Sequence, residues 1–216
     1  MSLITLKNIK KEYGKNQVLF ENLSLEIEKG EFVGLVGKSG AGKTTLLNII
    51  GLITDISEGT ITIDSYQNLS VNSKNAMILR RYTIGYLFQN YGLIEDESIL
   101  WNLKLALEYK KMKKKEKLKV INKYLEQFEL SDMLNKKVYQ LSGGEQQRIA
   151  IIKLILQGSQ IILADEPTSG LDKENEMIVM KLLKKLNEKG ITIIMVTHNM
   201  NLCNYFSRVI NVENFR

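Results

Sequence analysis

The chain has 216 residues, of which 44% are hydrophobic, and its 30 basic and 24 acidic residues give a formal net charge of +6. A chain of this length can bury one sizeable core, so we expect a single domain with lobes. The single cysteine excludes an internal disulfide framework. No apolar stretch approaches the ~18–20 residues that a membrane helix requires, and the first residues lack the long apolar core of a signal peptide. We therefore expect a soluble, cytoplasmic protein.

The first third of the chain predicts an antiparallel β lobe. Turn signals at Lys29-Gly30 and Glu58-Gly59 separate short alternating or apolar segments. These strand candidates are residues 3–9, 18–28, 31–36 and 59–64.

Later apolar runs alternate with helical stretches, a pattern typical of a parallel sheet with crossover helices. These runs are residues 84–88, 160–165, 191–196 and 208–212. Ligands bind at the carboxyl ends of the strands in such sheets, so polar motifs that follow the strands are expected to converge there.

Residues 37–44 have the spacing G-x-x-x-x-G-K-T and follow an apolar strand candidate. The glycines let backbone N–H groups point inward, and the helix that starts near Gly42 adds its positive dipole end. Lys43 would reach the β- and γ-phosphates of a nucleotide, and the Thr44 hydroxyl would ligate Mg²⁺. A glycine-rich turn that binds nothing is the alternative. The residues expected at the nucleotide are Gly37, Ser39, Gly40, Ala41, Gly42, Lys43, Thr44 and Thr45.

Residues 141–148 read Leu-Ser-Gly-Gly-Glu-Gln-Gln-Arg, in which Ser142 and Glu145 alone form a helix capping box. The box does not explain Gly143 and Gly144, because glycine in a first helical turn costs roughly 0.5–1 kcal/mol relative to alanine. We expect a close approach to this backbone, and a phosphate would fit beside the Ser142 hydroxyl and the helix dipole. Because the chain already has one phosphate loop, the second would serve a nucleotide held by another copy.

The segment between Gln89 and Leu141 has no clear strand and predicts a helical lobe. Two helices are expected, over about 98–112 and 115–129. The apolar face of the second helix is formed by Leu118, Ile121, Leu125 and Phe128.

A run of lysines within this lobe accounts for much of the net charge. It comprises Lys110, Lys111, Lys113, Lys114, Lys115, Lys117 and Lys119. The favoured interpretation is a solvated helical corner, and the alternative is attraction to anionic lipid. Nucleic acid is not expected as a partner, because no aromatic residues interleave with the lysines as stacking platforms.

With these motifs the chain resembles the ATP-binding cassette (ABC) ATPases over nearly its whole length. Residues 37–44 match the family's Walker A motif, and residues 141–148 match its signature motif. Further matches, in the family's order, are the Q-loop at 85–89, Walker B and its following residues at 161–167, the D-loop at 169–172 and the H-loop at 196–198.

The resemblance implies an α/β P-loop NTPase fold of ABC type. It would have a mostly parallel core sheet with crossover helices, an N-terminal antiparallel β lobe and an inserted helical lobe. Residues 1–216 would form one ABC ATPase domain. The core would comprise 1–88 and 146–216, and the helical lobe 89–145 would end in the signature motif.

The resemblance also implies a role for each motif residue, with ATP and Mg²⁺ as cofactors. Asp165 would hold Mg²⁺ through water, and Glu166 would act as general base. Gln89 would contact the metal or the water, and His198 would contact the γ-phosphate. Tyr13 would stack on adenine; its alternative is a core residue of the β lobe. Two adjacent carboxylates after four apolar residues would be costly without a cation.

Two copies of the chain would form the complete site. Lys43 is included among the catalytic residues, and Ser142, Gly143 and Gly144 would complete the site from a head-to-tail partner. Asp172, also an acceptable N-cap for a helix over about 173–189, would lie at that interface.

The resemblance implies a separate membrane permease as the partner, so that the cassette lies at the inner face of the membrane. A chromosome or repair ATPase commonly carries a long coiled-coil insertion between the motif halves, and the segment from Gln89 to Ser142 is too short for one. A ribosome-acting ATPase typically joins two cassettes in one chain, whereas each motif occurs once here. Within transport, residues 88–94 and 163–168 resemble the macrolide-export and lipoprotein-release group, and most closely its bacteriocin or peptide exporters. Trp101 and the segment 152–154 depart from that group's pattern. Trp101 is interpreted as a core residue, or as a contact for the permease.

Overall fold

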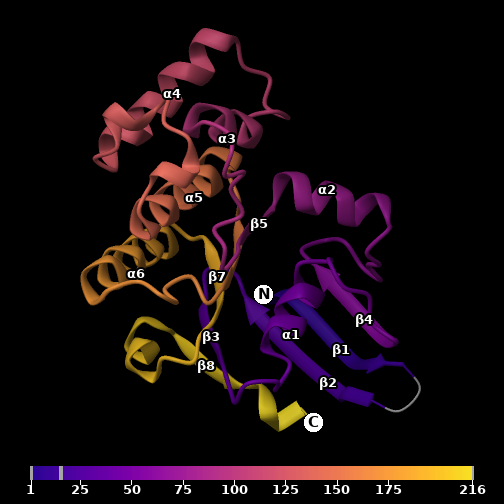
Figure 1. The fold of residues 1–216 in the computed structure, drawn as a ribbon. Helices are drawn as coiled ribbons and strands as arrows, with labels where there is room; N and C mark the ends of the chain where they lie inside the picture. The colour runs from indigo at the N-terminus through magenta and orange to yellow at the C-terminus, as the bar shows by residue number, and fades with distance from the viewer. Residues whose placement is uncertain (1, 15–16, 216) are drawn as a thin grey trace.

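Two β-sheets organise the chain, which the computed structural model describes over residues 2–14 and 17–215 (Figure 1). The smaller sheet is antiparallel, with the strand order β2-β1-β4. Its strands are β1 (Ser2–Tyr13), β2 (Gln17–Glu28) and β4 (Glu58–Ile63). Burial alternates along the second half of β2, which places one face of this sheet on the core and confirms the expected antiparallel lobe.

The larger sheet is parallel and has the strand order β5-β6-β7-β3-β8. Its strands are β3 (Phe32–Val36), β5 (Ile84–Leu87), β6 (Ile161–Asp165), β7 (Thr192–Val196) and β8 (Arg208–Asn211). The assignment of residues 31–36 to the antiparallel lobe is wrong, because β3 lies between β7 and β8. Every residue of β3 is buried, as is typical of a strand that is covered on both faces.

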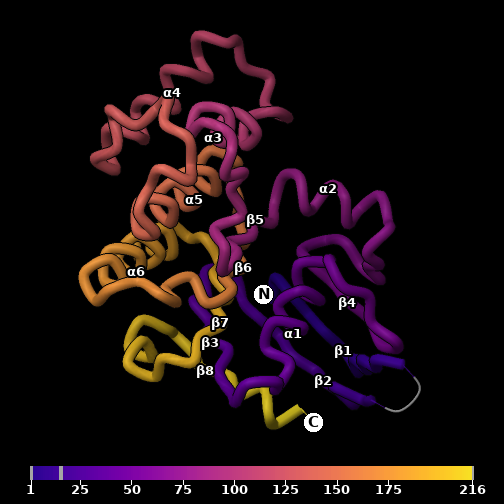
Figure 2. Tube along the Cα trace, in the orientation of Figure 1, coloured from indigo at the N-terminus to yellow at the C-terminus, as the bar shows by residue number. Residues whose placement is uncertain are grey.

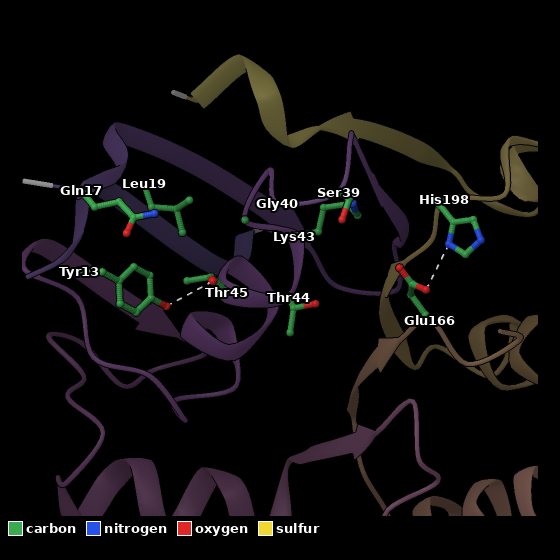
Figure 3. A pocket seen from close by; sticks show the side chains of 11 residues that line it. Tyr13, Gln17, Leu19, Ser39, Gly40, Lys43, Thr44, Thr45, Glu166 and His198 are labelled. Carbon is green, nitrogen blue, oxygen red and sulfur yellow. Dashed lines mark hydrogen bonds and ion pairs between the residues drawn. The ribbon is translucent and has the colours of Figure 1, made fainter.

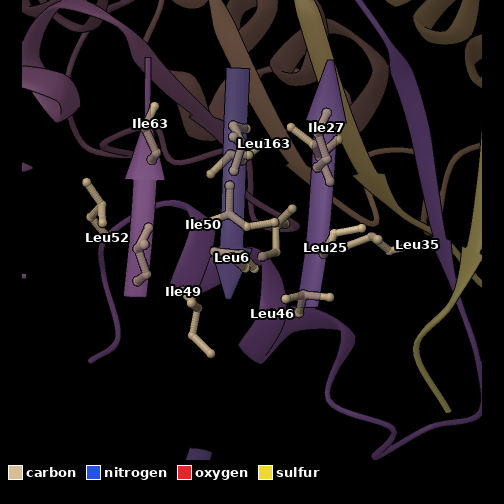
Figure 4. Close-up of a cluster of buried hydrophobic side chains, with 14 of the residues drawn as sticks. Leu6, Leu25, Ile27, Leu35, Leu46, Ile49, Ile50, Leu52, Ile63 and Leu163 are labelled. Atoms are coloured by element: carbon tan, nitrogen blue, oxygen red, sulfur yellow. The ribbon is translucent and has the colours of Figure 1, made fainter. Parts of the chain in front are cut away.

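Helices connect these strands and cover both faces of the parallel sheet. They are α1 (Lys43–Ile50), α2 (Lys74–Tyr82), α3 (Ile99–Ala106), α4 (Lys114–Gln127), α5 (Gly143–Gln157) and α6 (Lys173–Glu188). Short 3-10 turns occupy 131–133, 138–140, 200–205 and 212–215. Leu46 and Ile50 of α1 pack in one buried cluster with Leu6, Ile27 and Leu35 from both sheets (Figure 4). This cluster fixes α1, and with it the phosphate loop, between the two sheets.

The helical lobe is an excursion between β5 and β6. Figure 2 shows the chain leaving β5, running through α3 and α4, and returning along α5 to the core. A second buried cluster joins α3, α4, α5 and α6 to the other face of the parallel sheet. The second half of α5, from Ile149 to Leu156, belongs to this cluster, which holds that half of the helix against the parallel sheet.

Two details of the lobe differ from the prediction. The helix expected over 98–112 ends at Ala106, and residues 107–113 form the connection to α4. Leu118, expected on the buried face of α4, is 38% exposed, whereas Ile121 and Leu125 are buried. Leu118 shares the face of α4 that carries Ile121 and Leu125, but it lies near the start of the helix, where its neighbours cover it only partly.

Candidate nucleotide-binding site

The phosphate loop joins the end of β3 to the start of α1. Gly42 precedes the helix with φ 94°, and a Cβ on it would lie 2.7 Å from the Phe20 ring, so only glycine fits here. Lys43 is 7% exposed, and its Nζ donates hydrogen bonds to the carbonyl oxygens of Gly37 and Lys38 at 2.8 and 2.9 Å. The sequence-predicted arrangement of strand, glycine loop and helix is therefore present, with the lysine ammonium held against the loop.

A cavity of about 600 Å³ opens over this loop (Figure 3). Its lining comprises Tyr13, Gln17, Leu19, Ser39, Gly40, Gly42, Lys43, Thr44, Thr45, Glu166 and His198. The β1 and β2 residues lie at one end of the cavity, and the residues that follow β6 and β7 lie at the other. The sequence offered no motif that marks Gln17 and Leu19, so both were missed.

Tyr13 lies at the end of the cavity formed by β1 and β2. Its side chain is 45% exposed, which excludes the alternative that it is a core residue of the β lobe. The Tyr13 hydroxyl lies 3.3 Å from Oγ1 of Thr45, so the ring is tied to α1 and presents a face to the cavity (Figure 3).

Asp165, the last residue of β6, lies next to the phosphate loop. The Thr44 hydroxyl donates a hydrogen bond of 3.0 Å to Oδ1 of Asp165. Burial raises the pKa of Asp165; the Thr44 hydrogen bond and the Lys43 charge lower it, and the Glu166 charge adds to the increase. The two oxygens are hard donors of the kind that Mg²⁺ prefers. No cluster of three metal-ligating side chains occurs in residues 2–14 and 17–215, so phosphates and water would have to supply the other ligands.

Glu166 has an unusual backbone and faces the histidine. Its φ of 46° is left-handed, which is rare outside glycine and costs about 1–3 kcal/mol, and such strain concentrates at functional sites. The Glu166 N–H donates to the Val196 carbonyl, which pins the residue to the end of β7. Nδ1 of His198 lies 3.1 Å from Oε2 of Glu166 (Figure 3). Carboxylate and imidazole thus share one edge of the cavity.

Several sequence-predicted residues lie elsewhere in this chain. Gln89 follows β5 at the same sheet edge, but it is exposed and does not line the cavity. Gly37 and Ala41 belong to the loop without lining the cavity, and Ala41 is buried. The signature residues, at the start of α5, also lie outside it.

The capping box at the start of α5 is confirmed. The Glu145 N–H donates to Oγ of Ser142, and Oε2 of Glu145 accepts from the Ser142 N–H at 2.7 Å. Although burial pushes the pKa of Glu145 upward, these hydrogen bonds from Ser142 hold it below its ordinary value. Ser142 itself is exposed and remains accessible to a second molecule.

Gly144 also packs closely against a neighbouring helix. Gly144 is buried, and a Cβ on it would overlap the side-chain amide of Asn175 from α6. At Gly143 a Cβ would lie 2.8 Å from the Tyr91 hydroxyl. Packing within the chain is therefore a second reason for glycine at these positions, beside the approach of a phosphate that the sequence predicts.

Asp172 is the N-cap of α6, as the sequence predicts. Its Oδ1 accepts a 2.8 Å hydrogen bond from the Asn175 N–H, and this bond is the main cause of a lowered Asp172 pKa. Asp172 and Ser142 are both exposed caps at the starts of neighbouring helices.

Sequence reasoning also missed the residues that hold the segment after Gln89. Nζ of Lys153 donates a 2.7 Å hydrogen bond to the Gly92 carbonyl, and burial lowers the Lys153 pKa. Asn102 is fully buried and bonds the N–H and carbonyl of Ile94 at 2.8 and 3.1 Å. The only sequence signal was their position. Asn102 follows Trp101, and Lys153 lies within 152–154, the two places where the chain departs from the pattern of the macrolide-export and lipoprotein-release group.

In the described part of the chain, no helix has the length and apolar character needed to cross a membrane.

Comparisons with known proteins agree with this geometry. Residues 20–169 match the family model described as ABC transporter. The chain is 43% identical over 211 residues to the macrolide export ATP-binding/permease protein MacB of Campylobacter jejuni, which covers 98% of this chain but 33% of that protein. It is 42% identical to an uncharacterized ABC transporter ATP-binding protein, MJ1508, of Methanocaldococcus jannaschii, over 98% of this chain and 96% of that one.

A solved structure shows the same fold. It is the dimeric post-hydrolysis state of the ATP-binding cassette MJ0796 bound to ADP and Pi, with a TM-score of 0.87 and 38% identity. The match covers 96% of this chain and 93% of that one. The chain spans about a third of the length of the MacB relatives that it matches. With its P-loop fold, its cavity over the phosphate loop and these relatives, the chain belongs to the ABC transporter family and is an ABC-type ATPase domain.

Proposed function

We propose that the chain is the ATP-hydrolysing motor of an exporter, works as a head-to-tail pair and drives a membrane permease. The observation that carries this proposal is the division of the motifs. Lys43, Thr44 and Glu166 line one cavity and Asp165 is hydrogen-bonded to Thr44 beside it, whereas Ser142 stands exposed outside it. A second copy that presents its Ser142 to this cavity would complete the site.

In this arrangement each residue near the cavity has a distinct task. Lys43, now bonded to loop carbonyls, would place its charge on the β- and γ-phosphates. Glu166 would accept the proton of the attacking water as that water bonds to the γ-phosphorus. His198, 3.1 Å from Glu166, would hold the carboxylate and contact the γ-phosphate. Tyr13 would stack on the adenine ring.

Thr44 and Asp165 fit a magnesium ion. Their side-chain oxygens already lie 3.0 Å apart. Thr44 would ligate the ion directly, Asp165 would hold it through water, and Gln89 would approach from the end of β5. When bound, Mg²⁺ would offset negative charge on the phosphates.

The permease would contact the apolar side chains near Gln89. Phe88, Ile94, Trp101 and Leu105 are 41%, 46%, 38% and 40% exposed, an unusual concentration of large apolar groups on α3 and the segment before it. This exposure supports the contact interpretation of Trp101 over the core interpretation. Lys153 and Asn102 would brace this surface through Gly92 and Ile94.

Export is supported by the MacB relatives, whose name describes macrolide export. We propose an amphiphilic cargo, with a peptide or bacteriocin as the class that the motif resemblance favours. An importer or another envelope ATPase with a membrane partner is the alternative.

Glu166→Gln tests this function. The variant should still bind ATP, should lose turnover by about 10²–10⁴-fold because the general base is gone, and should accumulate an ATP-dependent dimer in size-exclusion chromatography. Glu188→Gln, an exposed carboxylate at the end of α6, is the matched control and should leave turnover unchanged.

Turnover by the Glu166→Gln variant at the unaltered rate would contradict the general-base role. The membrane protein that co-purifies with the ATP-trapped form would identify the permease. Recovery of DNA or ribosomes instead would contradict the transport proposal.

A further inference from the structure

The net charge of this chain resides in one segment of the helical lobe. Residues 110–123, hereafter the basic segment, contain eight lysines and one glutamate and so carry +7. Since the whole chain carries +6, all the rest of it is close to neutral, at −1. A general excess of lysine for solubility would be spread over the surface, whereas this charge is concentrated in the connection before α4 and in α4 itself.

The lysines of the basic segment are not neutralised by neighbours. All but Lys117 are exposed, and none forms an ion pair within residues 2–14 and 17–215. Oε2 of Glu116 accepts a hydrogen bond from the Lys113 N–H at the start of α4 and is committed to that cap. Seven of the eight lysines therefore face outward, and among the described residues Glu126 is the one carboxylate that lines the hollow beside Lys115, Lys119 and Lys123.

The lysines also form a row on α4 whose mutual repulsion destabilises the helix. Lys115, Lys119 and Lys123 are spaced four apart, so they are neighbours on one face of α4 and repel one another. Leu118 is exposed within this row, and together with Val120 it lines the same hollow as the three lysines. A helix face with lysines around apolar side chains has the composition of a membrane-surface helix.

We propose that the basic segment binds anionic lipid headgroups, with Leu118 entering the boundary between headgroups and acyl chains. The fit is electrostatic, because each lysine near an anionic bilayer strengthens binding about fivefold. No aromatic ring lies within residues 110–123, and nearby Tyr109 is already occupied by edge contact with Tyr82 and by Arg81, 4.6 Å from its ring. Stacking platforms for single-stranded nucleic acid are thus absent from the basic segment.

The position of the basic segment agrees with this partner. It starts a few residues after α3, whose exposed Trp101 and Leu105 form the proposed permease contact. In Figure 1, α4 lies beyond α3 at the far end of the helical lobe. The position of the basic segment supports lipid binding only if the proposed function is right, whereas its charge and its exposure do not depend on that function.

The test is co-sedimentation of the full chain with vesicles, without nucleotide or permease. The chain should pellet with vesicles that contain phosphatidylglycerol and stay in solution with phosphatidylcholine alone, and added salt should release it. Changing Lys115, Lys119 and Lys123 to Gln should weaken binding about a hundredfold, since three charges are removed. ATPase turnover in solution should not change.

Three lysines of a second helix provide the matched control. Lys181, Lys185 and Lys189 are exposed and have the same spacing of four on α6 and its C-cap. Changing them to Gln removes the same charge and should leave vesicle binding within about fivefold, the effect of one residue. Circular dichroism should show both triple variants folded.

Equal losses for the two triple variants would show that only net charge matters and would overturn the proposal. Absence of binding to phosphatidylglycerol vesicles would also overturn it, as would displacement of the chain from vesicles by single-stranded DNA at equal phosphate concentration. Because no nucleotide is present, these outcomes are independent of those of Glu166→Gln.

Discussion

Gly144→Ala tests whether packing against Asn175, and not only the approach of a phosphate, requires glycine in the signature motif. If Asn175 requires it, the added Cβ forces the Asn175 amide to move. That amide is held, because Nδ2 donates a 2.8 Å hydrogen bond to Asp172 and Oδ1 accepts a longer one, 3.5 Å, from Arg148. Overpacking of this kind costs about 1–3 kcal/mol, and the higher helix propensity of alanine offsets about 0.5–1 kcal/mol of that cost. We expect a net loss of about 1–2 kcal/mol in the free energy of unfolding.

Urea denaturation without nucleotide measures this loss in the isolated chain. Asn175→Ala gives the control, since it removes the obstructing amide. The double variant should be more stable than the sum of the two single changes by about 1–2 kcal/mol, as expected for residues in contact. A gain of 0.5–1 kcal/mol from Gly144→Ala alone would refute the reasoning, because helix propensity would then act unopposed.

Two further predictions concern the composite site and the Walker B carboxylate. Chains with Ser142→Phe and chains with Lys43→Ala should each hydrolyse ATP poorly, and a mixture should regain activity, because a mixed pair has one intact site; additive residual activities would contradict the head-to-tail pair. Asp165→Asn should abolish magnesium-dependent turnover yet raise the melting temperature. The melting temperature should rise because the Asp165 pKa is raised, which means that the fold favours the protonated carboxyl group. That proton is bound below the ordinary pKa of 3.8 and is lost as the pH rises, so the charged carboxylate destabilises the fold at neutral pH. If Asp165→Asn and the unaltered chain had the same melting temperature between pH 6 and 8, that result would argue against a cost of the carboxylate.

Much of the site could be predicted because short-range chemistry specifies it. The spacing around Lys43 and Thr44 encodes the phosphate loop locally, and a strand candidate ends at Asp165, directly before Glu166. Parallel strands expose their carboxyl ends at one edge, so His198, after β7, meets Glu166 without any further information.

Other expectations were wrong where packing decides. The sequence of β3 does not state which sheet it joins; its burial on both faces follows from its neighbours β7 and β8. Leu118 has the right spacing for a buried stripe, but near the start of α4 the neighbouring elements leave it 38% exposed. A further reason for glycine at position 144 is the contact with Asn175, more than thirty residues later in the chain, which no local pattern reveals.

The sequence alone predicted the reaction chemistry, because phosphate binding, metal ligation and base catalysis require particular residue types at fixed local spacing. Only the tertiary structure decided how these groups are shared. It placed Tyr13, Lys43 and Glu166 around one cavity, with Asp165 beside it, and left Ser142 outside it. It also left most lysines of the basic segment exposed and without ion pairs in the described part of the chain, since burial and ion pairing depend on contacts that only folding creates.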